Sequence, residues 1–393
     1  MKENHLVAKE HEPMENTETA SEDAPRIAIV GSGPSGCYTA QFLRKRWPDA
    51  EIVIFDRLDT PYGLIRYGVA PDHLGTKAIA KQFERLFTRD GVQFIGGVDI
   101  GRDIPIADLR ADFDVVVLAT GLWADRTVDG FHRLDGSATH EGVYGSGELT
   151  RMINGHPDRK SGSIRVGRRS VIVGNGNVAI DLVRLLLTPP AGLAALGVPD
   201  DAIAAVSSGP VDHIDVVGRS NVAYAKFDSA MVRELGKLPD VRFTSDIEAL
   251  DQDSEKANSI AGLVDASPVS ATREVRFHFG WTPSHLDGPR HVERAVFRDT
   301  AGRRNQLVLE ANSVCTAVGF TEAVDDVLLR STLECEATDL SRGLLGNGVY
   351  CVGWFRRGPV GTIPANRSDA RTVADAIIAD IEAGQRSNAV AQS

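Results

Sequence analysis

Two glycine-rich turns, each between an apolar strand and a helix, constrain this chain most strongly. The first turn covers residues 31–36 and follows the apolar stretch 26–30; the second covers residues 174–179 and follows the stretch 171–173. In a GxGxxG or GxGxxA turn, the first glycine permits the tight turn and the second lets a pyrophosphate approach the backbone. The last small residue lets the helix pack on the strand. We therefore predict an α/β fold with two dinucleotide-binding, Rossmann-like domains.

The first turn carries the marks of a site for an unphosphorylated adenosine. Gly31, Gly33 and Gly36 occupy the three small positions, and an apolar strand is predicted over 52–55. Asp56 ends that strand twenty residues after Gly36, where a carboxylate binds ribose hydroxyls. This context favours FAD or NAD over NADP, and it makes an ordinary strand–turn–helix unit the weaker alternative. The glycine- and proline-rich stretch 61–73 should lie over a flat group rather than form a helix.

The second turn has a cation where the first has a carboxylate. Its helix is predicted to run through Leu187 and to stop before Pro189, and a strand is predicted over 213–217. Gly218 and Arg219 follow that strand. A cation at this position selects a ribose 2′-phosphate, and hence NADP. An unrelated surface arginine is the alternative.

A third glycine-rich stretch, residues 353–363, follows a predicted strand over 349–352 and precedes a helix predicted from about Ser368 to Ile381. Repeated glycines indicate close backbone approach to a ligand, although Trp354 could simply belong to the core. In flavoenzymes with two dinucleotide sites, backbone amides meet the flavin ring at such a turn.

Composition excludes several other classes. The net charge of −11 argues against nucleic-acid binding, and no apolar run approaches the ~20 residues of a membrane span. The four cysteines never occur as C-x-x-C, which argues against dithiol exchange and against a zinc or iron–sulfur site, so no metal is expected. We expect each cysteine to be a small buried residue. Residues 1–23 carry seven acidic residues against two lysines and should be a disordered tail rather than a targeting segment; we expect a cytoplasmic protein.

Beyond these patterns, the chain resembles the adrenodoxin-reductase family of ferredoxin–NADP reductases, including its bacterial members. The stretches "RYGVAPDH" and "GWFRRGPVGTI" are more specific than either glycine turn, and "VIVGNGNVAIDLVRLLLTPP" and "VVVLATGLWADR" match as well. The resemblance spans residues 26 to about 380. It implies hydride transfer from NADPH to FAD, followed by single-electron transfer to a ferredoxin-type iron–sulfur protein that serves cytochromes P450 or similar acceptors.

The resemblance also implies site residues. It places FAD on Ser35, Asp56, Leu64, Val98, Trp354, Gly361, Thr362 and Ile363. It places the pyridine nucleotide on Arg126, Asn175, Gly176, Asn177, Val178, Arg219 and Ser220. His73 and Glu234 match a polar pair near the hydride-transfer region; because the cofactors carry the chemistry, we expect at most a tuning or proton-relay role for His73. Three arginines are candidates for docking an acidic partner: Arg233, Arg356 and Arg357.

Three departures from the family pattern bear on the nucleotide and on the electron acceptor. Ser220 replaces a second phosphate-binding arginine, Met231 replaces a carboxylate, and residues 127–136 replace a segment that ends in proline-glycine. A pathway-specific oxidoreductase acting on a small molecule, and a non-catalytic flavin-binding protein, are therefore kept as alternatives.

The expected domain organisation is discontinuous. An FAD domain should comprise 24–121 and 314–386, joined near residues 318–319, with an NADP domain over 122–313. Residues 251–289 should be surface hairpin and loop, and residues 387–393 a disordered tail. We expect a monomer that binds neither nucleic acid nor membranes.

Overall fold

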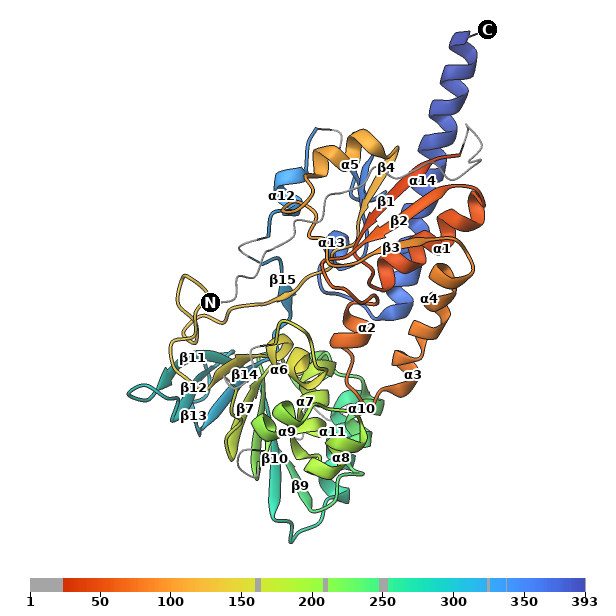
Figure 1. Cartoon of the computed structure of the whole chain (residues 1–393). Coiled ribbons are helices and arrows are strands. Elements are labelled where there is room, and N and C mark those ends of the chain that lie inside the picture. The colour runs from red at the N-terminus through yellow and green to blue at the C-terminus, as the bar shows by residue number, and fades with distance from the viewer. Residues whose placement is uncertain are drawn as a thin grey trace, which may run out of the picture.

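The structure is a computed structural model that describes residues 24–159, 164–207, 211–246, 254–323, 326–336 and 338–392. The acidic tail 1–23 lies outside the described residues. The chain forms two halves, each built on a six-stranded sheet, and Figure 1 shows them one above the other.

The first half is the sheet β16-β17-β4-β1-β2-β3, parallel except for its edge strand β16. Its strands are β1 Arg26–Val30, β2 Glu51–Phe55, β3 Gln93–Ile95, β4 Val115–Leu118, β16 Leu344–Gly346 and β17 Val349–Cys351. Both faces of the sheet are buried, so β4 is wholly apolar and β1 and β2 are apolar beyond their first residues, Arg26 and Glu51. Ile27 and Ile29 pack on the α1 and α14 side, whereas Ala28 and Val30 face the opposite cluster.

Helices cover both faces of this sheet. They are α1 Pro34–Arg46, α2 Leu64–Tyr67, α3 Leu74–Lys77, α4 Ile79–Thr88, α5 Ile106–Asp112, α12 Arg330–Leu333, α13 Trp354–Arg357 and α14 Ile363–Gln392. The short helix α2 shows that part of the stretch 61–73 is helical, contrary to our expectation. Helix α14 begins five residues earlier than predicted and continues through the expected tail to Gln392, because its last turns contain alanine, glutamine and arginine, which favour helix.

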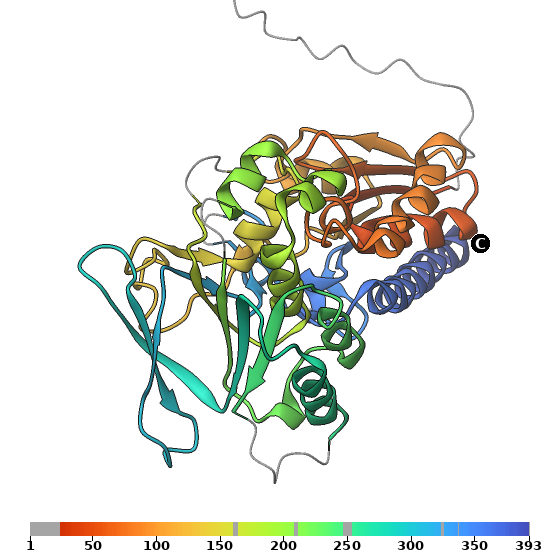
Figure 2. The same cartoon turned by 90° about the horizontal axis from the view of Figure 1, so that it is seen from below.

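The second half is the fully parallel sheet β6-β14-β7-β8-β10-β9. Its strands are β6 Val143–Gly145, β7 Arg169–Val173, β8 His213–Gly218, β9 Val241–Ser245, β10 Arg273–Phe279 and β14 Ser313–Thr316. One face carries α6 Ser146–Ile153, α7 Asn177–Leu187, α8 Pro190–Ala195, α9 Asp200–Val206, the 3₁₀ turn η1 Val222–Tyr224, α10 Ser229–Leu235 and α11 Glu255–Ala266. The other face packs on an antiparallel sheet of β11 Trp281–Asp287, β12 Arg294–Asp299 and β13 Leu307–Glu310, which projects to one side in Figure 2.

Two sequence expectations are wrong in this half. Residues 254–289 form α11, β10 and β11 rather than surface hairpin and loop; residues 251–253 lie outside the described part. Strand β10 lies between β8 and β9, with Val275 and Phe277 fully buried, and its alternating apolar positions were the missed signal. Strand β14 also belongs to the second sheet, so the chain returns to the first half after Thr316 and not at residue 314.

The chain crosses between the halves twice, side by side. Strand β5, Ala124–Asp125, pairs antiparallel with β15, Phe320–Thr321. These paired crossings fit the predicted junctions near residues 121–122 and 318–319. They make the first half discontinuous, with the second half inserted into it.

Candidate functional site

The first glycine turn has the geometry of a pyrophosphate cradle. Gly31 has a φ of +107°, and a Cβ there would lie 2.4 Å from the carbonyl oxygen of Ala119. A Cβ at Gly36 would lie 2.0 Å from the Gly31 oxygen, whereas a Cβ at Gly33 would meet nothing within 4 Å. The outer glycines are therefore required by packing, and the middle one faces open space at the start of α1, where a helix N-terminus favours an anion.

Asp56 is fixed beside this cradle. Its carboxylate is 8% exposed and accepts hydrogen bonds from the Ser32 backbone N–H at 2.8 Å, from the Ser32 hydroxyl, and from the Leu58 N–H at 2.9 Å. The Val98 N–H donates to the Asp56 carbonyl at 3.0 Å. Two predicted FAD residues from different segments are thus brought together at the carboxyl edge of the first sheet.

The C-terminal glycine turn reaches the same edge. A Cβ on Gly353 would lie 2.2 Å from the Ser35 hydroxyl oxygen, so this turn rests directly on the first cradle. Trp354 stacks on Phe320, with ring centroids 5.7 Å apart, and its buried indole Nε1–H has no partner among the described residues. A buried donor without a partner is costly, which fits a cofactor at this place. Leu64 and Ile363 are half-buried, while Gly361 and Thr362 are exposed.

A buried carboxylate that sequence analysis missed stabilises this turn. Asp369, 4% exposed, accepts from the Gly353 N–H at 2.5 Å and from Arg356 Nε at 2.9 Å, and it lies 3.1 Å from Arg357 Nε. Arg356 and Arg357 are therefore engaged inside the molecule and are unavailable as the docking residues that we expected. The available signal was the apolar face of α14, on which Asp369 and the buried Val373 both lie.

The second glycine turn repeats the geometry of the first. Gly174 has a φ of +124° and lies against the Ala317 carbonyl, and a Cβ on Gly176 would meet no neighbour closer than 3.9 Å. Asn177 Oδ1 accepts from the Asp228 N–H at 2.7 Å. The Nδ2 group of Asn175 is buried and has no partner within the described part of the chain. These residues, with the half-buried Val178, fit the phosphates of a dinucleotide at the start of α7.

Arg219 lies at the end of β8, where the sequence predicts a 2′-phosphate. Its side chain is exposed, and no residue of the described ranges forms a hydrogen bond or ion pair with its guanidinium. The Ser220 carbonyl accepts from the Gly280 N–H at 3.1 Å, which fixes the loop backbone. Arg126 lies elsewhere, on the crossing beside β5, where its Nε donates to the Phe320 carbonyl at 3.1 Å.

His73 belongs to a charged cluster that joins the two halves. Arg184 of α7 pairs with Asp72 through Nε and Oδ2 at 2.5 Å and through Nη2 and Oδ1 at 3.0 Å. His73 Nε2 lies 2.9 Å from Arg184 Nη2 and 3.3 Å from Asp181 Oδ1. Burial raises the pKa of Asp181 against the opposing charges of His73 and Arg184. Sequence analysis missed Arg184, whose only signal was a cation three residues after Asp181 in a mostly apolar helix.

Glu234 is not part of this cluster. On α10 it lies 3.9 Å from Lys237, and it forms no hydrogen bond or ion pair with His73 among the described residues. The two residues that match the family's polar pair thus make no direct contact among the described residues, and the role of the pair stays a prediction. Met231, which replaces a carboxylate of that pattern, packs against the core of the second half.

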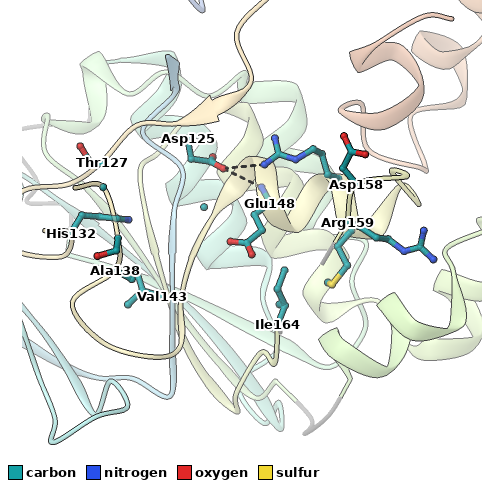
Figure 3. A pocket seen from close by; sticks show the side chains of 14 residues that line it. Asp125, Thr127, His132, Ala138, Val143, Glu148, Asp158, Arg159 and Ile164 are labelled. Atoms are coloured by element: carbon teal, nitrogen blue, oxygen red, sulfur yellow. Dashed lines mark hydrogen bonds and ion pairs between the residues drawn. The ribbon is translucent and has the colours of Figure 1, made fainter. Parts of the chain in front are cut away.

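A cavity of about 460 Å³ opens elsewhere, between the crossing segment and α6. Figure 3 shows Thr127 and His132 on one side and Asp158 and Arg159 on the other, with Asp125 and Glu148 between them. None of the predicted cofactor residues lines it. Asp125 accepts hydrogen bonds from the Gly147 and Glu148 N–H groups at 2.7 and 3.1 Å. Its carboxylate is therefore already engaged at the N-terminus of α6.

Three of the four cysteines are buried, as expected, but Cys335 is exposed. Burial raises the pKa of the Cys37 and Cys315 thiols and brings that of Cys351 to about 12. These three are protonated and unreactive at neutral pH.

Comparison with known proteins agrees with this geometry. A family model described as an NAD(P)-binding Rossmann-like domain matches residues 29–82. Cindoxin reductase of Citrobacter braakii is 46% identical over 92% of this chain and 79% of its own length. The mitochondrial NADPH:adrenodoxin oxidoreductase of Arabidopsis thaliana is 29% identical over 93% and 84%. The chain belongs to the adrenodoxin-reductase family of ferredoxin–NADP reductases.

The solved structures support the same family. Mycobacterium tuberculosis FprA in complex with NADPH superposes with a TM-score of 0.82 at 28% identity, covering 93% of this chain and 86% of that one. The predicted fold class, the FAD and NADP cofactors and the NADPH-dependent flavoprotein reductase activity are confirmed. Within the described residues, no helix combines the length and the apolar character needed to cross a membrane.

Proposed function

We propose that this reductase takes electrons from NADPH bound at the second glycine turn and passes them, through FAD at the first, to a small ferredoxin-type iron–sulfur protein. The observation that carries the proposal is the pairing of two open cradles, one beside the carboxylate of Asp56 and one beside the exposed guanidinium of Arg219. FAD supplies the hydride acceptance and the release of single electrons. The chain contributes binding, orientation and electrostatics.

The residue roles follow from the two cradles. Gly33 and the N-terminus of α1 receive the FAD pyrophosphate, Asp56 accepts from ribose hydroxyls, and Trp354 donates its free indole N–H to the flavin end. Asn175 and Gly176 receive the pyrophosphate of NADPH, and Arg219 pairs with its 2′-phosphate.

His73 has an electrostatic and positioning role in this proposal. It is held between Arg184 and Asp181 at the interface of the halves, and hydride transfer requires no protein base. Glu234 lies outside this cluster, so we give it no part in the transfer.

Anaerobic mixing with NADPH tests the proposed activity. We expect the yellow protein to bleach rapidly with NADPH and more slowly with NADH. We also expect cytochrome c reduction to need an added electron carrier. A protein that NADPH does not bleach, or one that reduces a small molecule well but no carrier protein, would overturn the proposal.

The Citrobacter relative favours a second candidate partner. Its name identifies cindoxin as its acceptor, and at 46% identity it is much nearer to this chain than the adrenodoxin reductase at 29%. A panel that contains several ferredoxins and cindoxin separates the two candidates by the kcat/KM for each carrier. A clear preference for cindoxin would replace the ferredoxin-type acceptor.

We expect Arg233 to help dock an acidic partner. It is 59% exposed on α10 and lies 3.9 Å from Glu255, an exposed pair that contributes little. Arg233→Glu should raise the KM for the carrier several-fold at low salt and much less at high salt, because salt screens exposed charges. Arg242→Glu, an exposed arginine on β9, is the matched control. Equal effects of the two variants would contradict a docking role for Arg233.

We further propose a cytoplasmic monomer. Sedimentation of the holoprotein at micromolar concentration tests the monomer, and cell fractionation tests the location.

A further inference from the structure

A buried histidine of the second half lies against the carboxyl edge of the first sheet. His156 is 0% exposed and follows α6. Its ring packs edge-on against Tyr67 of α2, with centroids 4.8 Å apart, and against Trp123 on the crossing segment at 5.9 Å. Trp123 in turn donates its indole N–H to the carbonyl of Thr120, just beyond β4. The imidazole therefore sits over the sheet edge at which Rossmann folds bind their ligands.

The tautomer of this ring is fixed. The backbone N–H of Asp158 donates to Nδ1 of His156 at 3.0 Å. Burial lowers the pKa of His156 to about 4; the charge of Asp158 opposes this shift, and those of Arg57 and Arg151 add to it. At neutral pH the ring is thus uncharged, and because Nδ1 accepts, its single proton is on Nε2.

The Nε2–H group has no partner among the described residues, although it is buried. An unsatisfied buried donor costs roughly 1–3 kcal/mol, so a partner other than the described residues is expected. His156 does not line the cavity of about 460 Å³. Asp56, which we assign to the FAD ribose, is followed by Arg57, whose guanidinium lies over the Trp123 ring at 4.6 Å and 3.6 Å from Asp158. The segment of Asp56 therefore meets the same residues that surround His156.

We propose that the Nε2–H of His156 donates a hydrogen bond to an oxygen of the ribose–pyrophosphate portion of bound FAD. The NADP-binding half thereby contributes a residue to the FAD site. FAD then holds the two halves together through His156 as well as filling the first cradle. This inference rests on FAD being bound at the first glycine turn.

Two substitutions separate the hydrogen bond from packing. His156→Leu keeps most of the volume and removes the donor; His156→Gln keeps an N–H donor at nearly the same reach. We expect His156→Leu to speed FAD release from the diluted holoprotein by about tenfold or more, in line with the loss of one hydrogen bond, and His156→Gln to stay within about threefold of the parent. His132→Leu is the matched control, because His132 Nδ1 also accepts a backbone N–H, from Val128 at 3.1 Å, away from the FAD site.

A spectroscopic readout tests the contact directly. In holoprotein labelled with ¹⁵N-histidine, we expect an exchange-protected Nε2–H resonance that is lost in His156→Leu. Equal FAD release from the parent and His156→Leu would overturn the proposal. Equally fast release from the leucine and glutamine variants would also overturn it, since that result assigns the effect to packing. A parent protein that binds no FAD would instead refute the cofactor assignment on which the proposal rests.

Discussion

At the scale of single residues, nucleotide choice depends on the end of β8. Arg219 is exposed and its guanidinium has no hydrogen-bond or ion-pair partner within the described ranges, and the sequence neighbours Gly218 and Ser220 carry no carboxylate that could accept from a 2′-hydroxyl. Ser220 can donate one hydrogen bond, whereas an arginine would add a charge and a bidentate fork. Because hydrogen bonds to charged groups contribute roughly 1.5–3 kcal/mol, we expect a moderate NADPH preference, about tenfold weaker than two arginines would give.

Three proteins test this prediction. Arg219→Ala should abolish the preference and Ser220→Arg should strengthen it, as measured by kcat/KM for NADPH and NADH in the parent and both variants. A parent that prefers NADH, or an unchanged ratio in Arg219→Ala, would show that the 2′-phosphate is bound elsewhere.

At the scale of elements, the junction of β17, α13 and α14 depends on one carboxylate. Asp369→Asn leaves two largely buried guanidiniums without their counter-charge. Breaking a buried pair typically costs ~3–5 kcal/mol, so we expect a loss of that order in the free energy of unfolding, with faster FAD release. Asp375→Asn, on the exposed side of the same helix with Arg371, should cost less than about 1 kcal/mol. Denaturant titration of both holoprotein variants compares the two, and similar losses would contradict the prediction.

A second feature at the scale of elements is a network of histidine–aspartate hydrogen bonds that joins β8 to β10. His278 Nε2 lies 2.7 Å from Asp215 Oδ1, and His213 Nε2 lies 3.0 Å from the other oxygen. Burial disfavours charge on His278, but hydrogen bonds to Asp215 and Asp246 outweigh it and raise its pKa; the hydrogen bond to Asp215 raises the pKa of His213. In the unfolded chain a histidine has a pKa of about 6.5. Because the pKa values of His213 and His278 are higher in the folded protein, their protonation stabilises the fold fully below pH ~6.5, and this stabilisation is lost as the pH rises through the folded-state pKa values.

We therefore expect the melting temperature of the holoprotein to fall as the pH rises above about 6.5. The fall should be smaller in His278→Asn, which removes one of the two titrating imidazoles. His285→Asn changes an imidazole that is 50% exposed on β11 and serves as the control. A parallel pH dependence in the parent and His278→Asn would contradict this assignment.

At the scale of the whole molecule, the two halves are held in register by the Asp72–Arg184 pair. The Arg184 side chain is 10% exposed and makes two contacts with Asp72. Arg184→Ala should loosen the halves and slow flavin reduction by saturating NADPH about tenfold or more, because a misplacement of ~1 Å can cost about 100-fold in rate. The NADPH concentration at half-saturation should change little.

Stopped-flow reduction of the holoprotein measures both quantities. Arg168→Ala, which breaks an exposed pair with Asp212 inside the second half, is the control and should leave the rate unchanged. A normal rate in Arg184→Ala would mean that other contacts set the orientation of the halves.

The sequence by itself located the two glycine turns, placed Asp56 and Arg219 after the strands that follow these turns, and indicated the family. Each glycine turn is a local requirement: a φ near +107° or a carbonyl 2.4 Å from a potential Cβ admits only glycine, so the residue type reveals the geometry. The order of β8, β10 and β9 was not determined locally. The alternating apolar positions of β10 indicate a strand, but its neighbours are set by pairing with segments distant in sequence.

Only the tertiary structure decided which charges are paired. From the sequence, Arg356 and Arg357 were expected to be available for docking an acidic partner. Helix α14 instead brings Asp369 into contact with both side chains. Arg184 and Asp72 are 112 residues apart in sequence, and His156 reaches the edge of the first sheet from the other half of the molecule. The physical reason is that a charge or a ring nitrogen has no preferred local partner. Its environment depends on which distant segments the two sheets and the paired crossings bring to it.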